Sequence, residues 1–145
     1  MRHTISYLFL LLVALPGMSQ PIFQTNGVAI RGYDPVAYFL DNIPTEGLAE
    51  YSTTWQGVEW RFKSKENLDL FTGNPEKYAP QFGGFCAYGV SDNHKSPTDP
   101  SAFTVVNEKL YLNYSPKVKQ LWSKDREMHI RRAETNWPSL ELSKE

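Results

Sequence analysis

Helix-capping and turn residues divide this chain into short segments, and this division is the feature that most limits the fold. Three positions carry an Asp or Ser that can accept a hydrogen bond from the first turn of a following helix: Asp34, Ser64 and Ser115. Proline follows the first and the third, in a helical position whose N–H has no intrahelical partner. The spacing predicts short helices over 35–40, 64–71 and 75–78, and a longer helical region that begins at Pro116 and ends at Pro138.

The C-terminal helical region carries an apolar stripe that is interrupted near its middle. Apolar residues recur at helical spacing on both sides of the polar segment 123–127. The pattern fits one long helix, or two helices that meet at a bend near Asp125. We expect the residues after Pro138 to fray.

Two pairs of alternating apolar and polar segments flank short turns, which is typical of β-hairpins. The paired segments are 51–55 with 58–62, and 103–106 with 110–112. In the first hairpin, Trp60 and Phe62 fall on one face, because alternate residues of a strand point the same way. A length of 145 residues suits one domain. We therefore predict a single α+β domain with two β-hairpins, short helices and a long C-terminal helix.

The N-terminal residues have the features of a secretory signal peptide. Arg2 gives a positive start, the run from Ile5 to Leu15 is apolar, and the small residue Ser19 offers a cleavage site. The run is shorter than the ~20 residues needed to cross a bilayer, so no stable membrane span is expected after cleavage. We expect an exported protein, periplasmic or secreted. The expected division is a signal peptide at 1–19, a leader at 20–31, the main domain at 32–138 and a tail at 139–145.

The composition is that of a globular protein with an aromatic core. Hydrophobic residues make up 41% of the chain and charged residues 21%, which excludes a disordered chain. Aromatic residues reach 14%, so the Trp and Tyr side chains are interpreted first as core. The net charge is −1 and no basic stripe is present, so no nucleic-acid partner is expected.

The one cysteine, Cys86, lies in the Gly-rich aromatic stretch 83–89. A lone cysteine cannot form an internal disulfide. It is either an inert apolar filler, or paired with Cys86 of a second chain in a homodimer, or held free for metal or thiol chemistry. A thiolate is the preferred ligand of a soft metal such as Cu(I) or Zn(II).

Three further residues are candidate partners of Cys86. His94 follows in a polar loop, and Met128 and His129 stand side by side in the C-terminal helical region. They could complete a metal site, although no regular Cys or His spacing predicts a closed zinc site within one chain. Alternatively, His94 could act as a base that activates Cys86 as the nucleophile of a thiol enzyme or redox protein.

Several segments are similar to the exported YHS domain-containing proteins of bacteria. The similar segments are 32–39, 78–89, 99–100 and 109–113. The resemblance covers about residues 27–138, and it implies a treble-clef-like core and a metal-associated role. Metal-binding members of the family carry cysteines where this chain has Ala37 and Lys63-Ser64. The resemblance therefore implies that the usual metal site is absent and that only Cys86, in its Gly-Gly-aromatic-Cys-Ala motif, remains.

Three functional hypotheses stay open at this point. The first is a non-enzymatic exported protein that binds or handles a soft metal, copper or zinc with copper preferred, through Cys86 with help from His94, Met128, His129 or a second chain. The second is a thiol enzyme or redox protein that uses Cys86. The third is a structural or small-ligand-binding module without a cofactor, in which Cys86 is core and aromatic residues line a pocket.

Overall fold

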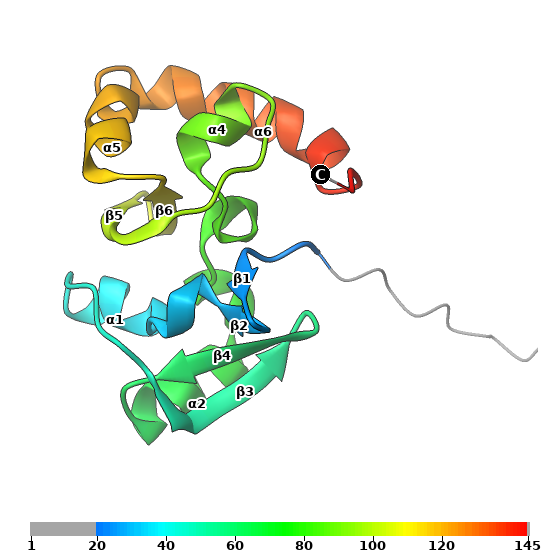
Figure 1. The fold of residues 1–145 in the computed structure, drawn as a ribbon. Helices are drawn as coiled ribbons and strands as arrows, with labels where there is room; N and C mark the ends of the chain where they lie inside the picture. Colours follow the sequence, from blue (N-terminus) through cyan, green and yellow to red (C-terminus); the bar gives the residue numbers. More distant parts are fainter. Residues whose placement is uncertain (1–19, 145) are drawn as a thin grey trace, which may run out of the picture.

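The computed structural model describes residues 20–144. Within these residues, six strands in two sheets and six α-helices form one small α+β domain, as predicted (Figure 1). The signal peptide predicted at 1–19 lies outside the described residues. No helix between residues 20 and 144 is both long and apolar enough to cross a membrane.

The larger sheet contains four strands in the order β1-β2-β4-β3. Its strands are β1 (Gln24–Thr25), β2 (Val28–Ala29), β3 (Leu48–Trp55) and β4 (Val58–Phe62). The predicted hairpin is confirmed, but β3 begins earlier than expected, at Leu48, where a register irregularity separates Leu48 from Ser52. The hairpin places Trp60 and Phe62 on the buried face, where both side chains are fully enclosed.

Three helices share the first layer with the larger sheet, and predicted side-chain caps precede the first two. They are α1 (Pro35–Leu40), α2 (Lys65–Gly73) and α3 (Pro75–Tyr78). Ser64 caps α2 by accepting a hydrogen bond from the Asn67 N–H at 3.2 Å. Phe71 of α2 packs on the rings of Phe62 and Trp60 at centroid distances of 5.0 and 5.2 Å. This contact joins α2 to the inner face of the hairpin.

The rest of the chain builds a second layer, drawn in the upper half of Figure 1. It contains a 3-10 segment (Gln81–Gly84), α4 (Ala87–Ser91), β5 (Asp99–Val106), β6 (Lys109–Asn113), α5 (Pro116–Ser123) and α6 (Arg126–Leu140). The second predicted hairpin, β5–β6, is confirmed. The helical region is two helices that meet near Asp125, one of the two arrangements that the sequence left open.

The prediction that Pro138 ends the last helix is wrong. Helix α6 continues through Pro138 to Leu140, which is 9% exposed and part of the core. A proline within a helix removes its own N–H donor and crowds the carbonyl oxygen four residues earlier, so it disfavours the helix but does not forbid a last turn around it. Residues 139 and 140 are therefore helix and not frayed tail.

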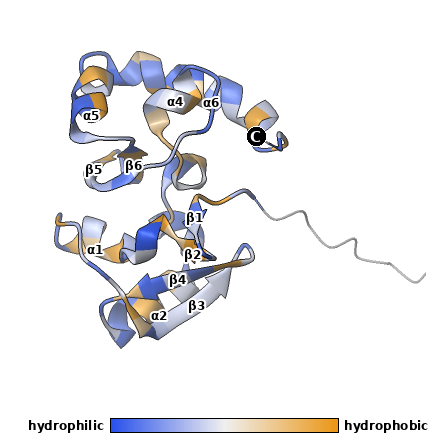
Figure 2. Ribbon diagram, in the orientation of Figure 1, coloured by the Kyte–Doolittle hydropathy of each residue, from blue (hydrophilic) through white to orange (hydrophobic). Residues whose placement is uncertain are grey.

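Two hydrophobic clusters form the core, one for each layer. The first lies between the larger sheet, α1, α2 and β6, and it includes Trp60, Phe62, Phe71, Leu110 and Leu112. The second lies among α4, α5, α6 and β6, and it includes Phe82, Tyr111 and Trp122. Strand β6 joins the two, because alternate side chains enter opposite clusters. Figure 2 shows hydrophilic residues along the outer helices α5 and α6.

Residues 20–31, expected to be a leader, are an integral part of the fold. Strand β2 pairs in parallel with β4, with Val28 opposite Glu59. Ile22 and Ile30 are buried at 5% and 2% exposure in the first cluster. The apolar residues 28–30 fit the short strand β2, but the pairing of that strand with β4 and the burial of Ile22 come from tertiary contacts.

A partly buried hydrogen bond connects the two layers. The Tyr38 hydroxyl of α1 donates to the Pro100 carbonyl oxygen of β5 at 2.7 Å. Burial, together with nearby Tyr33, Asp99 and Asp34, raises the pKa of Tyr38 well above its usual range. The hydroxyl therefore stays protonated and remains a donor to β5.

Candidate functional site

The paired glycines ahead of Cys86 allow the backbone to pass close to the N-terminal residues. Gly83 and Gly84 have positive φ angles of 64° and 85°. A Cβ atom on Gly83 would overlap the backbone oxygen of Pro21, and one on Gly84 would lie 2.9 Å from the Ile30 side chain. Both positions therefore require glycine. The close backbone path that they allow leads to Cys86, which stands at the start of α4.

The Cys86 thiol is enclosed in the protein and its polar contacts are satisfied. Cys86 is 2% exposed, and its thiol donates to Asn113 Oδ1 at 3.4 Å. The sulfur in turn accepts from the backbone N–H groups of Tyr114 at 3.2 Å and Gly89 at 3.5 Å. Burial raises the pKa of Cys86, and the N–H groups offset that effect only in part. Cys86 is therefore a neutral thiol at neutral pH.

Asn113 is the residue of this cluster that the sequence did not single out. It is fully buried at the end of β6, and its Oδ1 atom also accepts from the Tyr88 N–H at 3.0 Å. One side chain thus holds both Cys86 and the first turn of α4. Its Nδ2 group has no hydrogen-bond partner among residues 20–144. The only signal in the sequence is a polar residue that ends an apolar strand.

The other candidate metal ligands make separate contacts. His129 Nδ1 lies 3.0 Å from the Ser91 hydroxyl, and its ring packs beside Tyr88 at 5.0 Å between centroids. Met128 is half-buried on α6, and His94 is exposed. None of the three is hydrogen bonded to Cys86. Within the described part of the chain, no group of three or more His, Cys, Asp or Glu side chains is placed to hold a metal ion.

The positions where related domains carry metal-binding cysteines have structural roles in this chain. Ala37 is fully buried in α1, where its methyl group packs in the core. Ser64 caps α2, and Lys63 forms a surface ion pair with Asp41. None of these three side chains is a soft metal ligand.

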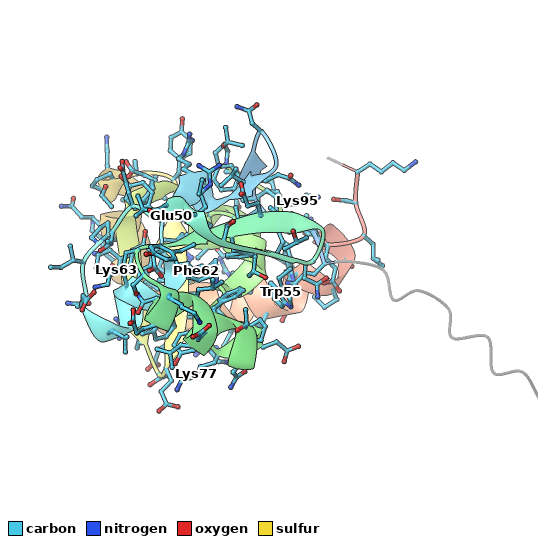
Figure 3. All side chains as sticks on the ribbon, turned by 90° about the horizontal axis from the view of Figure 1, so that it is seen from below. Glu50, Trp55, Phe62, Lys63, Lys77 and Lys95 are labelled. Carbon is cyan, nitrogen blue, oxygen red and sulfur yellow. The ribbon has the colours of Figure 1, made fainter. Side chains whose placement is uncertain are left out.

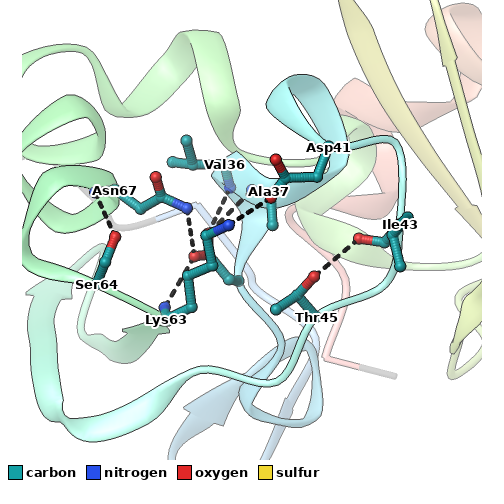
Figure 4. A network of polar contacts seen from close by, with 9 residues as sticks. Val36, Ala37, Asp41, Ile43, Thr45, Lys63, Ser64 and Asn67 are labelled. Atoms are coloured by element: carbon teal, nitrogen blue, oxygen red, sulfur yellow. Dashed lines mark hydrogen bonds and ion pairs between the residues drawn. The ribbon is translucent and has the colours of Figure 1, made fainter.

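Asp34 is a buried carboxylate whose role is to hold the first layer together. Its Oδ1 atom accepts from the N–H groups of Val36 at 2.8 Å and Ala37 at 3.2 Å, which confirms the predicted helix cap. Its Oδ2 atom accepts from the Lys63 N–H at 2.9 Å and from Asn67 Nδ2 at 2.8 Å (Figure 4). Asp34 therefore links α1, β4 and α2 and is not free for catalysis.

A cleft of about 400 Å³ opens where the two layers meet. Its walls include the aromatic residues Trp55, Phe82 and Trp137, and its charged residues are Glu76, Lys109 and Glu134. Trp55 ends strand β3, and Figure 3 shows it at the turn end of the hairpin. The ring of Trp137 in α6 packs edge-on against Phe82 at 5.9 Å. This combination of aromatic walls and a few charged groups is typical of small-molecule sites.

The charged residues of the cleft are exposed and are not neutralised by one another. Glu76, Lys109 and Glu134 are all exposed, and none belongs to an ion pair within residues 20–144. Burial, and secondarily the charge of Glu134, raises the pKa of Tyr111. The residues of this cleft come from distant segments, so no pattern in the sequence groups them.

Comparison with known proteins identifies one part of the chain. The protein is a small α+β domain that encloses one thiol and has a cleft between its layers. Residues 36–82 match the YHS domain family, so a YHS domain is present in the first layer. No curated protein and no solved structure matches the chain. The YHS domain is consistent with a metal-related role.

Proposed function

We propose that this protein is a non-enzymatic binding domain that holds a small organic ligand in the cleft between its two layers. The cleft is the observation that carries this proposal. Its volume of about 400 Å³ lies in the range of ~300–1,000 Å³ found for small-molecule sites, as do hollows of about 410 and 450 Å³ elsewhere on the surface; its three aromatic lining residues set this cleft apart from them. The YHS segment supplies Trp55 and Glu76 from the first layer, and Phe82 at its end packs against Trp137 of the segment after it.

The state of Cys86 supports a structural role for the thiol. An activated or metal-binding cysteine needs thiolate character and access. Cys86 has a raised pKa and 2% exposure, and Asn113 accepts its proton. The same enclosure works against a disulfide-linked homodimer through Cys86, because the thiol would first have to be exposed.

The four tryptophans provide the test. Trp55 and Trp137 line the cleft, whereas Trp122 is fully buried and does not line it. Trp60 is also buried, but it packs against Trp55 and donates to the Trp55 carbonyl oxygen, so its signal is expected to follow that of Trp55. We expect small aromatic amines, alcohols or acids to shift the indole NMR signals of Trp55 and Trp137 and to leave that of Trp122 unchanged. The proposal is refuted if no compound of such a set moves the signals of Trp55 and Trp137 at millimolar concentration, or if the Trp122 signal moves with them.

A soft-metal role is the second candidate, and the YHS domain is the observation that favours it. Cys86 would be the central ligand of Cu(I) or Zn(II), helped by His94, Met128, His129 or a second chain. The two N–H groups that point at the sulfur would stabilise a thiolate once it forms. The decisive comparison is Cu(I) affinity against a competing chelator. Equal affinity of the parent protein and Cys86→Ser would exclude this role.

Export stays part of the proposal. The positive start and the short apolar run of residues 1–19 support it. Expression of the full chain in a bacterium should give periplasmic or secreted protein that begins at Gln20, as read from its intact mass. Cytoplasmic protein that retains Met1 would contradict it.

A further inference from the structure

We infer that the protein associates with a second copy of itself through strand β3, the free edge of the larger sheet. The two copies of β3 would run antiparallel about a two-fold axis at Thr53, so that their sheets join into one. This inference goes beyond the proposed ligand site and does not depend on it. It follows from the open backbone groups of β3, from the order of its side chains and from a hollow beside it.

Strand β3 offers backbone hydrogen-bonding groups along its outer edge. It is the last strand in the order β1-β2-β4-β3, and Figure 1 shows no strand beyond it. In an antiparallel pair, every second residue directs its N–H and C=O groups away from the neighbouring strand. Glu59 of β4 stands opposite Thr54, and its N–H donates to the Gly27 carbonyl oxygen at 3.0 Å, on the side away from β3. Thr54, and by alternation Ser52, therefore direct their backbone groups to the outer edge, where no strand of residues 20–144 pairs with them.

The regular part of this edge lacks the features that usually keep sheet edges apart. Such edges are commonly blocked by a proline, by a charged side chain, by a bulge or by a very short strand. The opposite edge of the sheet is the two-residue strand β1. Residues 51–55 of β3 contain neither proline nor a charged residue. The register irregularity between Leu48 and Ser52 leaves 52–55 in regular pairing with β4.

A symmetric register satisfies the open groups of two antiparallel copies of β3. Residues that direct their backbone groups toward the other strand form hydrogen-bonded pairs, and the residues between them form closer, non-hydrogen-bonded pairs. With Ser52 of each copy opposite Thr54 of the other, these residues exchange N–H···O bonds, and Thr53 falls on the two-fold axis. Both copies then use the same surface, as a closed dimer requires.

The side chains of β3 favour this register, because they match one another when the strand is reversed. The register places Tyr51 of each copy beside Trp55 of the other, on either side of a central pair of Thr53 side chains. Tyr51 and Trp55 both pack against the first cluster, so they share the inner face of the sheet. Aromatic pairs and Thr–Thr pairs stabilise neighbouring antiparallel strands. Glu50 would stand opposite the uncharged Gln56, so no like charges meet.

A hollow beside the edge has room for a side chain of the second copy. Its volume is about 180 Å³, and it lies between β3 and the helices α2 and α3. Its lining residues are Thr53, Thr54, Trp55, Phe71, Thr72 and Pro75. Helix α2 therefore leaves the inner side of the edge open next to Trp55, where the register places Tyr51 of the second copy.

The test is the mass of the full mature chain, measured by sedimentation equilibrium from ~1 μM to ~1 mM. We expect the mean mass to rise from that of one chain toward that of two, and the amide NMR signals of Ser52 and Thr54 to shift over the same range. Thr53→Lys should raise the dimer dissociation constant by about fivefold or more, because two ammonium groups would meet at the axis. Thr53→Glu should act in the same way through two carboxylates.

An equimolar mixture of the two variants tests the register itself. An ammonium group then stands opposite a carboxylate, so the mixture should associate about fivefold or more tightly than either variant alone. Such a recovery also requires that both variants fold. Thr25→Lys is the matched control, because Thr25 is an exposed threonine of the opposite edge strand β1. Association should be unchanged in this variant.

A parent protein that is still monomeric at ~1 mM overturns the inference. Association that Thr53→Lys leaves unchanged, that Thr25→Lys weakens equally, or that the mixture does not recover also overturns it. If the parent is monomeric and a synthetic peptide of alternating Thr and Val shifts the amide signals of Ser52 and Thr54, the edge belongs to a peptide partner instead. The cleft is tested separately by ligand titration, so these outcomes leave the proposed function as it stands.

Discussion

Alkylation of Cys86 is the prediction that discriminates most sharply among the roles considered for the thiol. The sulfur is 2% exposed and contacts Asn113 of β6 and the first turn of α4. A reagent can reach it only after these elements separate, which disrupts the second cluster. With an opening free energy near the lower limit of domain stability, ~5 kcal/mol, the native rate would be about four thousand times below the unfolded rate. The raised pKa lowers the reactive thiolate fraction further.

The assay is a time course of iodoacetamide modification at neutral pH, read by intact mass, with and without guanidinium chloride. We expect full modification of the unfolded protein and almost none of the native protein over the same period. Cu(I) under reducing conditions should not change the native result, because no reactive thiol is present to protect. Native modification within tenfold of the unfolded rate would refute the enclosed thiol, and protection by Cu(I) would then favour the soft-metal role.

Three further predictions concern stability. Asp34→Asn places an amide N–H₂ against N–H donors and removes a buried charge that they stabilise, so it should lower the free energy of unfolding, measured by denaturant titration, by about 2–4 kcal/mol. Asp41→Asn, at the surface, should change the free energy of unfolding little. Equal effects of the two substitutions would contradict the buried network. Gly83→Ala should lower the free energy of unfolding by about 3 kcal/mol or more, because the new Cβ atom would overlap a backbone oxygen at a residue with positive φ. Gly73→Ala, whose Cβ atom would meet no atom within 4 Å, should leave the free energy of unfolding unchanged or raise it. Because burial raises the pKa of Cys86 above its ordinary value of 9.0, its contribution to stability is complete below that pH and is lost as the pH rises through the folded-state pKa. The unfolding free energy of the parent should therefore fall more steeply above pH 9 than that of Cys86→Ala; parallel curves would show that the thiol titrates normally in the folded state.

The local elements were predictable because their signals are local. Ser64 and Asp34 cap the helices that follow them, and alternation placed Trp60 on the inner face of the hairpin. The error at Pro138 has a local cause too, since a proline in the last turn of a helix is compatible with a continuing backbone.

The site was not predictable, because contacts between distant segments determine it. Asn113 reaches Cys86 across a separation of 27 residues, and nothing near either residue indicates the pairing. Trp55 and Trp137 are separated by most of the domain and meet only in the folded cleft. The aromatic residues that the sequence assigns to the core include some that are buried and some that line the cleft. Trp60 and Trp122 are fully buried, whereas Trp55 and Trp137 are partly exposed.

Strand β6 and the N-terminal strands also determine which portion of this chain could be transplanted into another protein. The family match spans residues 36–82, yet the cluster that packs against it takes Ile22 and Ile30 from before that span and Leu110 from after it. A gene fragment that encodes the matched span alone would yield a peptide with one side of its core open to water. We therefore expect the whole two-layer domain, and not the YHS match alone, to fold independently when it is moved into another protein. The YHS match covers only part of that folding unit.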